Sequence, residues 1–288
     1  MKRLLATLLS ALVVLGTAGA ASAQILVAKD GPVVYGHHHL NATNIEEQKK
    51  FFVNALGDTA VKFGANNAEV VKFPNVLVFF RMQAPTGGTR GTTVNHIGFS
   101  VPNLRRVVDK IKADGYKMIT RTEVAANQEV KDDIATLAGR NVSIAFALGP
   151  DDVKVELVEV KEQAAPIQLH HVHFFGQQNS EMQAWYVKVF GAKAGTGGGG
   201  AFPAATLPGL ALNFSPSPDP VVGTTGRSLD HIGFEIKDLE AFCKKLEGMG
   251  IKLTVAYRKV PALNLAIAFI NDPWGTNIEL TEGLDKVS

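Results

Sequence analysis

All eight histidines of this chain lie at four places, which is the pattern of a repeated chemical site. The four places are residues 37–39, His96, residues 170–173 and His231. Each stands in a short apolar segment with the composition of a β-strand. Imidazole binds transition metals and transfers protons near neutral pH. The pattern therefore predicts a unit that was duplicated together with a metal-binding or acid–base histidine.

The sequence repeats itself once at long range. The run His-Ile-Gly-Phe at residues 96–99 recurs at residues 231–234, an offset of 135. The run Val-Glu-Leu at residues 155–157 recurs as Ile-Glu-Leu at residues 278–280, an offset of 123. The second half has thus lost about 12 residues, which we place near positions 124–140. This duplication predicts two tandem domains, residues 24–162 and 166–288.

Each half contains two copies of a smaller unit. A unit begins with a histidine-bearing strand, continues as an amphipathic helix that ends at glycine, and finishes in short β-rich runs. Residues 43–46 have the pattern of a capping box at the start of the first helix. The four helices are expected to end near Gly57, Gly115, Gly191 and Gly250. The order β-α-β-β-β, four times over, predicts an α+β fold.

Residues 1–23 have the composition of a secretory signal peptide. Lys2 and Arg3 precede an apolar stretch, and Ala21-Ser22-Ala23 forms a small-residue cleavage signal before Gln24. We therefore expect an exported protein, periplasmic or secreted, with no membrane segment in its mature form. Beyond the leader, the sequence contains no run that is long and apolar enough to cross a bilayer.

The overall charge argues against a nucleic-acid-binding protein, and the cysteine count argues against a protein stabilised by disulfides. The formal net charge is +2 without a basic patch, so nucleic acid is not an expected partner. Cys243 is the only cysteine of the sequence, which rules out an internal disulfide. It lies on the apolar side of a predicted helix and is interpreted as a buried, unreactive thiol.

Four such units in two pairs resemble the vicinal oxygen chelate superfamily, which includes glyoxalase, bleomycin-resistance proteins and extradiol dioxygenases. The resemblance is carried by residues 96–104, residues 231–239, and the ending Asn-Asp-Pro-Trp-Gly-Thr-Asn-Ile-Glu-Leu at residues 271–280. It implies two tandem domains, each a pair of units that forms a cupped mixed sheet with helices outside. One fold hosts many reactions, so the function must be argued from the site.

The resemblance also implies a divalent metal ion on the floor of each cup. Its ligands would come from the first strand of each unit and the last strand of the second unit. Carried over half by half, the ligands are His37, His96 and Glu156 in the first domain, and His171, His231 and Glu279 in the second. Two imidazoles and one carboxylate suit Zn, Fe, Mn, Co or Ni.

Two features of the ligand strands bear on how open this site is. His37 is preferred within residues 37–39 because it keeps an offset of 134 to His171, and His39 and His173 then lie on the same face as these ligands. They could be extra ligands, hydrogen-bonding neighbours of the ligands or substrate contacts. Residues 78–81 and 212–215, where glyoxalase-like members often carry a fourth ligand, hold no Asp or Glu. Three protein ligands leave positions open for water or a chelating substrate.

These residues favour a metal-dependent lyase or isomerase of the glyoxalase type. It would act on a small substrate with two neighbouring oxygens through an enediolate-like intermediate. Glu156 or Glu279 would carry the proton, and Tyr257 could donate one. Two alternatives stay open: an Fe(II) or Mn(II) extradiol-type dioxygenase, and a non-catalytic small-molecule binder of the bleomycin-resistance type. The superfamily forms its cups within one chain or across a homodimer, and the sequence does not decide between the two.

Overall fold

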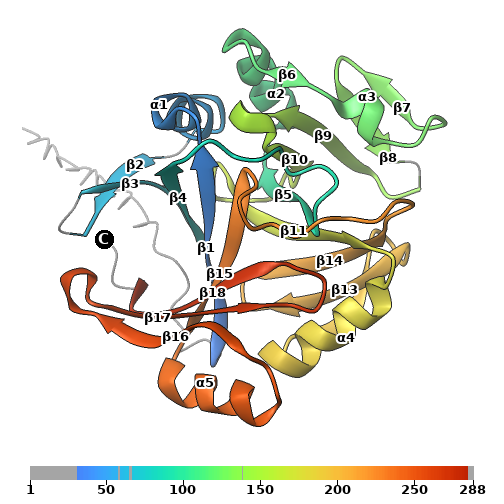
Figure 1. Cartoon of the computed structure of the whole chain (residues 1–288). Coiled ribbons are helices and arrows are strands. Elements are labelled where there is room, and N and C mark those ends of the chain that lie inside the picture. The colour runs from blue at the N-terminus through green and yellow to red at the C-terminus, as the bar shows by residue number, and fades with distance from the viewer. Residues whose placement is uncertain (1–30, 58, 65–66, 138, 285–288) are drawn as a thin grey trace, which may run out of the picture.

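The structure is a computed structural model that describes residues 31–284 except 58, 65–66 and 138. The predicted signal peptide lies outside the described residues. Among the described residues, no helix has the length and hydropathy needed to span a bilayer. The path of the chain through four successive units can be followed by colour in Figure 1.

The first two units contain the predicted order of elements, and the second has several further short elements after its helix. The first unit consists of β1 (Val33–Ala42), α1 (Ile45–Lys49), the π-helical turn η2 (Lys50–Ala55), β2 (Thr59–Phe63), β3 (Ala68–Phe73) and β4 (Val76–Met82). The second consists of β5 (Val94–Val101), α2 (Leu104–Ala113), β6 (Lys117–Met118), α3 (Thr120–Glu123), β7 (Glu129–Lys131), β8 (Ile134–Leu137), β9 (Val142–Leu148), the short turn η3 (Pro150–Asp152) and β10 (Lys154–Glu159).

The last two units follow the same order more simply. The third consists of β11 (Gln168–Gly176), α4 (Asn179–Phe190), β12 (Lys193–Gly197), β13 (Phe202–Leu207) and β14 (Leu210–Pro216). The fourth consists of β15 (Leu229–Ile236), α5 (Leu239–Gly248), β16 (Leu253–Val260), the short turn η4 (Pro261–Leu263), β17 (Leu265–Asn271) and β18 (Asn277–Glu282). The segment between α5 and β17 holds β16 and the turn η4, whereas the segment between α2 and β9 holds β6, α3, β7 and β8. This accounts for the residues that the second half lacks.

The helix ends agree with the sequence pattern, with a small difference at the first start. Asn44, and not Thr43, caps α1, because its side chain accepts hydrogen bonds from the backbone N–H groups of Glu46 and Glu47. At the other ends, α4 stops at Gly191, which has a left-handed φ of 71°. Gly115 follows α2 with a φ of 87°. Glycine adopts these angles without a steric cost, so the helices end where the chain must turn.

The strands form two mixed sheets, and each sheet takes one unit from either half of the sequence. The eight-stranded sheet has the order β16-β17-β18-β15-β1-β4-β3-β2, so the fourth unit joins the first. The ten-stranded sheet has the order β12-β13-β14-β11-β5-β10-β9-β8-β7, with β6 beside β9, so the third unit joins the second. The α+β architecture with two cupped sheets is confirmed. The grouping of ligands half by half was wrong, because β1 pairs with β15 and β5 pairs with β11.

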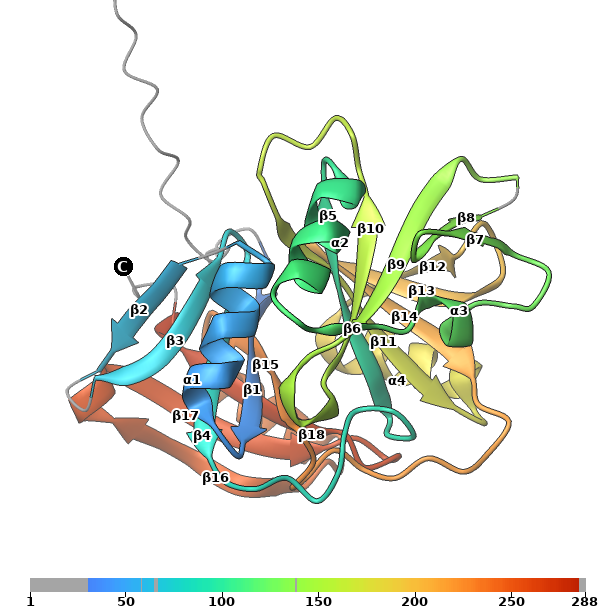
Figure 2. The same cartoon turned by 90° about the horizontal axis from the view of Figure 1, so that it is seen from above.

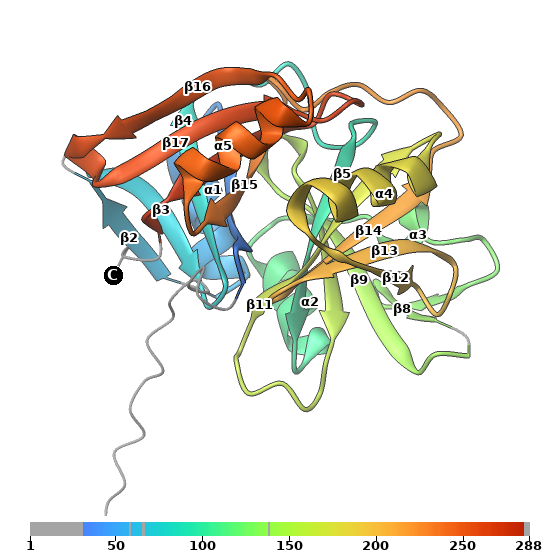
Figure 3. The same ribbon diagram turned by 90° about the horizontal axis from the view of Figure 1, so that it is seen from below.

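The two sheets lie side by side, and the helices lie at opposite sides of the molecule. Figure 2 shows α1 and α2 on one side, and Figure 3 shows α4 and α5 on the other. The largest core cluster joins residues of both sheets. The rings of Phe73 and Phe99 are 4.6 Å apart between centroids, and those of Phe190 and Phe234 are 4.3 Å apart. Burial of such rings stabilises the joint between the sheets by about 2 kcal/mol per side chain. The cysteine on α5, Cys243, is buried and free, as predicted.

Candidate metal centres

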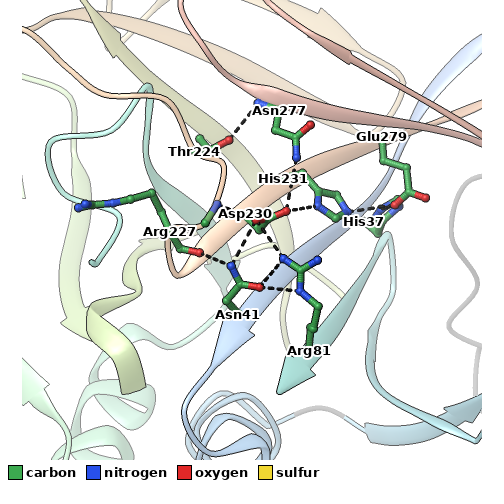
Figure 4. A network of polar contacts seen from close by, with 10 residues as sticks. His37, Asn41, Arg81, Thr224, Arg227, Asp230, His231, Asn277 and Glu279 are labelled. Atoms are coloured by element: carbon green, nitrogen blue, oxygen red, sulfur yellow. Dashed lines mark hydrogen bonds and ion pairs between the residues drawn. The ribbon is translucent and has the colours of Figure 1, made fainter. Parts of the chain in front are cut away.

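Three side chains converge in the middle of the eight-stranded sheet. Nε2 of His37 on β1 lies 2.9 Å from Oε2 of Glu279 on β18. Nε2 of His231 on β15 lies 3.0 Å from the same oxygen. We call His37, His231 and Glu279 the eight-strand centre. Figure 4 shows the three side chains pointing toward one another from three adjacent strands.

Local backbone features decide which histidine of the triple run reaches this centre. The ladder between β1 and β15 shifts register between Tyr35 and His37, and His37 then pairs with Gly233. His38 points to the opposite face, where the Tyr35 hydroxyl donates a hydrogen bond to its Nδ1 at 2.7 Å. His39 returns to the face of His37, and its ring lies 4.6 Å from that of His231. The structure therefore agrees with the choice of His37.

A matching group lies in the ten-stranded sheet. Nε2 of His96 on β5 lies 2.8 Å from Oε2 of Glu156 on β10, and Nε2 of His171 on β11 lies 3.1 Å from that oxygen. A ring nitrogen of His173 lies within 4.8 Å of the other donor atoms. We call His96, His171, His173 and Glu156 the ten-strand centre. His39, which matches His173 in the repeat, is not within that limit in the eight-strand centre.

The donor atoms of both groups fit a metal ion. Two ligands held at about 2.1 Å from one cation lie about 3.0 Å apart at the right angles of an octahedral site. The nitrogen-to-oxygen distances of 2.8 to 3.1 Å in the two centres match that value. The side chains of both glutamates are largely buried, with exposed fractions of 14% and 11%. Buried donors that converge on one point are the arrangement that divalent metal binding requires, and two imidazoles with one carboxylate suit Zn, Fe, Mn, Co or Ni.

A different residue orients the second histidine in each centre. Nδ1 of His231 donates to Oδ1 of Asp230 at 2.7 Å. At the matching position, Nδ1 of His96 donates to Oδ1 of Asn95 at 2.9 Å. Both contacts place the ring proton on Nδ1 and leave Nε2 as the atom that faces the glutamate. The sequence offset of 135 aligns Asp230 with Asn95, but their role was not predicted.

The two contacts give the two imidazoles different pKa values. Burial lowers the pKa of His231, but hydrogen bonds to Asp230 and Glu279 outweigh it and raise the pKa above its ordinary value. In the other centre burial dominates and lowers the pKa of His96 to about 3, against the opposing bond to Glu156. Burial by itself raises the pKa of both glutamates, yet the neighbouring imidazoles hold them below the usual range. Both carboxyls are therefore ionised at neutral pH.

Each centre opens into a hollow with mostly apolar walls. The ten-strand hollow has a volume of about 560 Å³ and contains Glu156, His170 and His173 in its lining. On the eight-strand side, one hollow of about 300 Å³ borders His37 and Glu279. A second, of about 520 Å³, borders Asp230 and His231. A small molecule that enters either cup would therefore meet the triad at its floor.

The remaining predicted site residue is Tyr257 on β16. Tyr257 is not brought to either centre: its ring packs against the main core cluster and does not line the hollows described above. Its strand, β16, shifts register between Val255 and Arg258, which changes the side chains that face the cup. The role of proton donor suggested for Tyr257 is therefore not supported by this geometry. Arg258 lines the smaller eight-strand hollow in its place.

The glycine-rich run at residues 195–200 contributes to the wall of the ten-strand hollow. It includes the end of β12 and the turn toward β13, where Gly198 and Gly199 line the ten-strand hollow beside Arg140. His170, also in that lining, places its Nδ1 2.8 Å from Nδ1 of the ligand candidate His171. Nothing in the local sequence marks the approach of Gly198 and Gly199 to Arg140, because it joins the third unit to the second.

The family model described as Glyoxalase/Bleomycin resistance protein/Dioxygenase superfamily matches residues 168–280. The match covers the third and fourth units of the chain. The match begins in the first strand of the third unit and ends in the last strand of the fourth, and the first two units repeat this pattern. No curated protein matches the chain.

The chain is also similar in fold to solved structures over most of its length. Glyoxalase I from Zea mays has a TM-score of 0.65 at 16% identity, over 91% of this chain and 97% of that one. A single-residue mutant of the same maize enzyme has a TM-score of 0.66 at 17% identity, over 88% and 94%. A putative dioxygenase from Bacillus subtilis subsp. subtilis str. 168 has a TM-score of 0.61 at 12% identity, over 86% and 84%. At these identities the likeness establishes the fold alone, and the reaction must be argued from the site.

Proposed function

We propose that this protein is an exported, metal-dependent enzyme of the glyoxalase type. It would act as a lyase or isomerase on a small substrate that presents two neighbouring oxygens. The observation that carries the proposal is the convergence of two imidazoles and one ionised carboxylate at the floor of a hollow, twice in one chain. The first 23 residues, with their signal-peptide composition, support export.

The proposed chemistry divides between the ion and the side chains. A bound divalent cation would polarise the substrate oxygens and stabilise enediolate-like charge. His37 and His231, or His96 and His171, would hold that cation in place. Glu279 and Glu156 are ionised at neutral pH, which is the form that accepts a proton. In Figure 4 the second carboxylate oxygen of Glu279 points away from both imidazoles, which leaves it free to meet a substrate hydrogen.

The apolar walls complete this arrangement. Phe79 packs its ring edge against His37, and Phe146 and Phe269 do so against His96 and His231. These rings limit the access of water to the imidazoles, and the electrostatic effect of a cation on a bound oxygen grows as water is excluded. A substrate with a small apolar body would fill the remaining volume.

The experiment is proton exchange measured in D₂O. Purified mature protein is loaded with Zn²⁺, Ni²⁺, Mn²⁺ or Fe²⁺ in turn and incubated with a panel of α-hydroxycarbonyl compounds. We expect deuterium at the hydroxyl-bearing carbon next to the carbonyl, detected by NMR, at a rate that falls at least about 100-fold in the double variant Glu156→Gln/Glu279→Gln. An absence of metal-dependent exchange or product with every ion would reject the proposal.

A second candidate is an extradiol-type dioxygenase on Fe(II) or Mn(II). The observation that favours it is His173, a further buried histidine in the lining of the ten-strand hollow, with its ring 4.6 Å from that of His96. An extradiol reaction needs an acid–base group beside the two-histidine, one-carboxylate site. Oxygen uptake with catechols by the iron-loaded protein, without exchange in D₂O, would favour this candidate. Tight binding of a ligand without metal or turnover would indicate a binder of the bleomycin-resistance type.

A further inference from the structure

The two centres differ at the residue that holds the second histidine in position. Asp230 on β15 accepts the Nδ1 proton of His231, and Asn95 on β5 accepts that of His96. The two residues occupy the same place in the repeat, directly before the histidine. One is a carboxylate and the other is a neutral amide of almost the same shape. The chain thus contains both versions of one contact on the same scaffold.

Several groups fix Asp230 with its Oδ1 toward His231, where that oxygen also accepts a hydrogen bond from Nδ2 of Asn277 at 3.4 Å. Its other oxygen, Oδ2, accepts hydrogen bonds from the backbone N–H of Gly226 at 2.8 Å and from the side chain of Asn41 at 3.3 Å. Nη2 of Arg81 lies 3.1 Å from the same oxygen. Figure 4 shows this network converging on Asp230 from β1, β4 and β15. The side chain of Asp230 is only 6% exposed, so water competes little for these contacts.

The ten-strand centre lacks this support. By the offset of 134, the positions that match Arg81 and Asn41 hold Ser215 and Phe175, and neither can clamp a carboxylate as a guanidinium and an amide do. By the offset of 123, Asn277 of the eight-strand centre is replaced by Lys154, whose side chain is 3% exposed. The ammonium of Lys154 pairs with Glu123 at 2.7 Å. Asp230 is thus balanced by Arg81, and Lys154 by Glu123. The difference that bears on the ligand is the group that contacts the histidine itself, a carboxylate in one centre and an amide in the other.

A carboxylate that accepts the proton of a ligating imidazole raises the basicity of that ligand and fixes its ring. An amide oxygen fixes the ring as well but contributes no charge. Loss of such a partner typically lowers metal affinity 10- to 100-fold. We propose that Asp230 is a positioning residue that sets the cation affinity of the eight-strand centre, and that Asn95 sets that of the ten-strand centre lower than its triad would otherwise allow. This rests on the metal centres of the proposed function, but not on the reaction.

The test exchanges the two residues in proteins that keep a single centre. Glu156→Ala leaves the eight-strand centre, and Glu279→Ala leaves the ten-strand centre. The probe is Zn²⁺ alone, titrated against a competing chelator into the purified mature chain. Each variant is compared with the parent protein that keeps the same centre. His170 and His173 are identical in the two proteins, so their contribution to the Zn²⁺ affinity cancels. Far-ultraviolet circular dichroism and thermal unfolding confirm that each variant is folded.

We expect Asp230→Asn to weaken Zn²⁺ binding by the eight-strand centre roughly 10- to 100-fold. We expect Asn95→Asp to tighten binding by the ten-strand centre, and by less, about 3- to 10-fold, because the new carboxylate lacks the clamp of Arg81 and Asn41. The gain is the decisive result, since a residue that merely supports the fold would not produce it. If Asp230→Asn does not fold, the Zn²⁺ affinity of Asn95→Asp alone tests the inference.

Three results would overturn the inference. They are a folded Asp230→Asn protein whose affinity changes less than threefold, an Asn95→Asp protein with unchanged or weaker binding, and single-centre proteins that are folded but bind no zinc. The last result would also remove the basis of the proposed function. Affinities that shift as expected, in a protein without activity on any substrate, would reject the proposed reaction and leave this inference intact.

Discussion

The imidazole of His37 lies directly over Gly233, so closely that a Cβ at that glycine would overlap the ring. The two residues are partners in the antiparallel ladder of β1 and β15. A glycine is therefore required on one strand for the ligand candidate on the neighbouring strand to lie flat against the sheet. The repeat preserves this relationship, because a Cβ at Gly98 would overlap His171 in the same way.

The first prediction concerns this close approach. Gly233→Ala is expected to displace His37 and to leave one bound metal ion per chain, where we expect two in the unchanged protein. Forcing a methyl group into a packed site costs about 1–3 kcal/mol, so the free energy of unfolding should fall by that amount. Elemental analysis after dialysis measures the metal content, and urea unfolding measures the stability.

Gly248→Ala in α5 is the matched control. A Cβ at Gly248 meets no atom within 4 Å, and alanine favours the helix by up to about 1 kcal/mol. This variant should keep both metal ions and lose no stability. Full metal content in folded Gly233→Ala would show that His37 does not need its place over the glycine.

Much of this fold could be predicted from the sequence, since periodicity and capping residues act locally. The helix that ends at Gly191 and the strands that carry His96 and His231 follow from patterns within about ten residues. The pairing of units could not be predicted. The first strands of all four units have similar apolar composition, so nothing local makes β1 prefer β15 over β5. The choice depends on the complete packing of both sheets, including contacts such as Phe73 on Phe99.

For the candidate site as well, the residue types could be predicted from the sequence but their grouping in space could not. The types of the six ligand candidates were visible because a duplicated histidine and a duplicated glutamate stand out against the rest of the chain. Their grouping was wrong because it followed the order of the sequence. The direction of Tyr257 could not be predicted, because the register shift in β16 between Val255 and Arg258 has no signal in the sequence. Asp230 and Asn95 directly precede His231 and His96 in the sequence. Their role depends on the direction in which Nδ1 of each imidazole points, and only the structure gives that direction.

The second prediction tests the pairing across the halves. The double variant His37→Ala/His231→Ala should keep one metal ion per chain, because both changes fall in the eight-strand centre. The double variant His37→Ala/His96→Ala should keep none, because it damages both centres. Elemental analysis distinguishes the two proteins directly. The reverse result would mean that each half of the sequence builds its own centre.

The third prediction separates His38 from its two neighbours. Tyr35→Phe removes the hydroxyl that hydrogen-bonds Nδ1 of the buried His38. A buried polar atom left without a partner costs about 1–3 kcal/mol, so the free energy of unfolding should fall by this amount. Because His38 faces away from the eight-strand centre, the metal content should stay at two per chain. A loss of one metal ion without a loss of stability would contradict the structural role that we assign to His38.

The fourth prediction concerns pH and Asp272, in the loop between β17 and β18. Oδ1 accepts backbone hydrogen bonds from Trp274 and Thr276, and Oδ2 accepts one from the Tyr186 hydroxyl. Burial nevertheless prevails and raises the pKa of Asp272 above its ordinary value. The native state therefore holds this proton more tightly than the unfolded state does. Its contribution to stability is complete below about pH 3.9 and is lost as the pH rises through the folded pKa.

Asp272→Asn, which keeps the shape and cannot ionise, isolates that contribution. The free energy of unfolding of the wild type minus that of Asp272→Asn should decrease as the pH rises from about 3.5 toward 7. Urea unfolding of both proteins at matched pH values gives the difference, in which all other titrating groups cancel. A difference that increases over this range would mean that the three hydrogen bonds outweigh burial and that the carboxylate form is the one the fold stabilises.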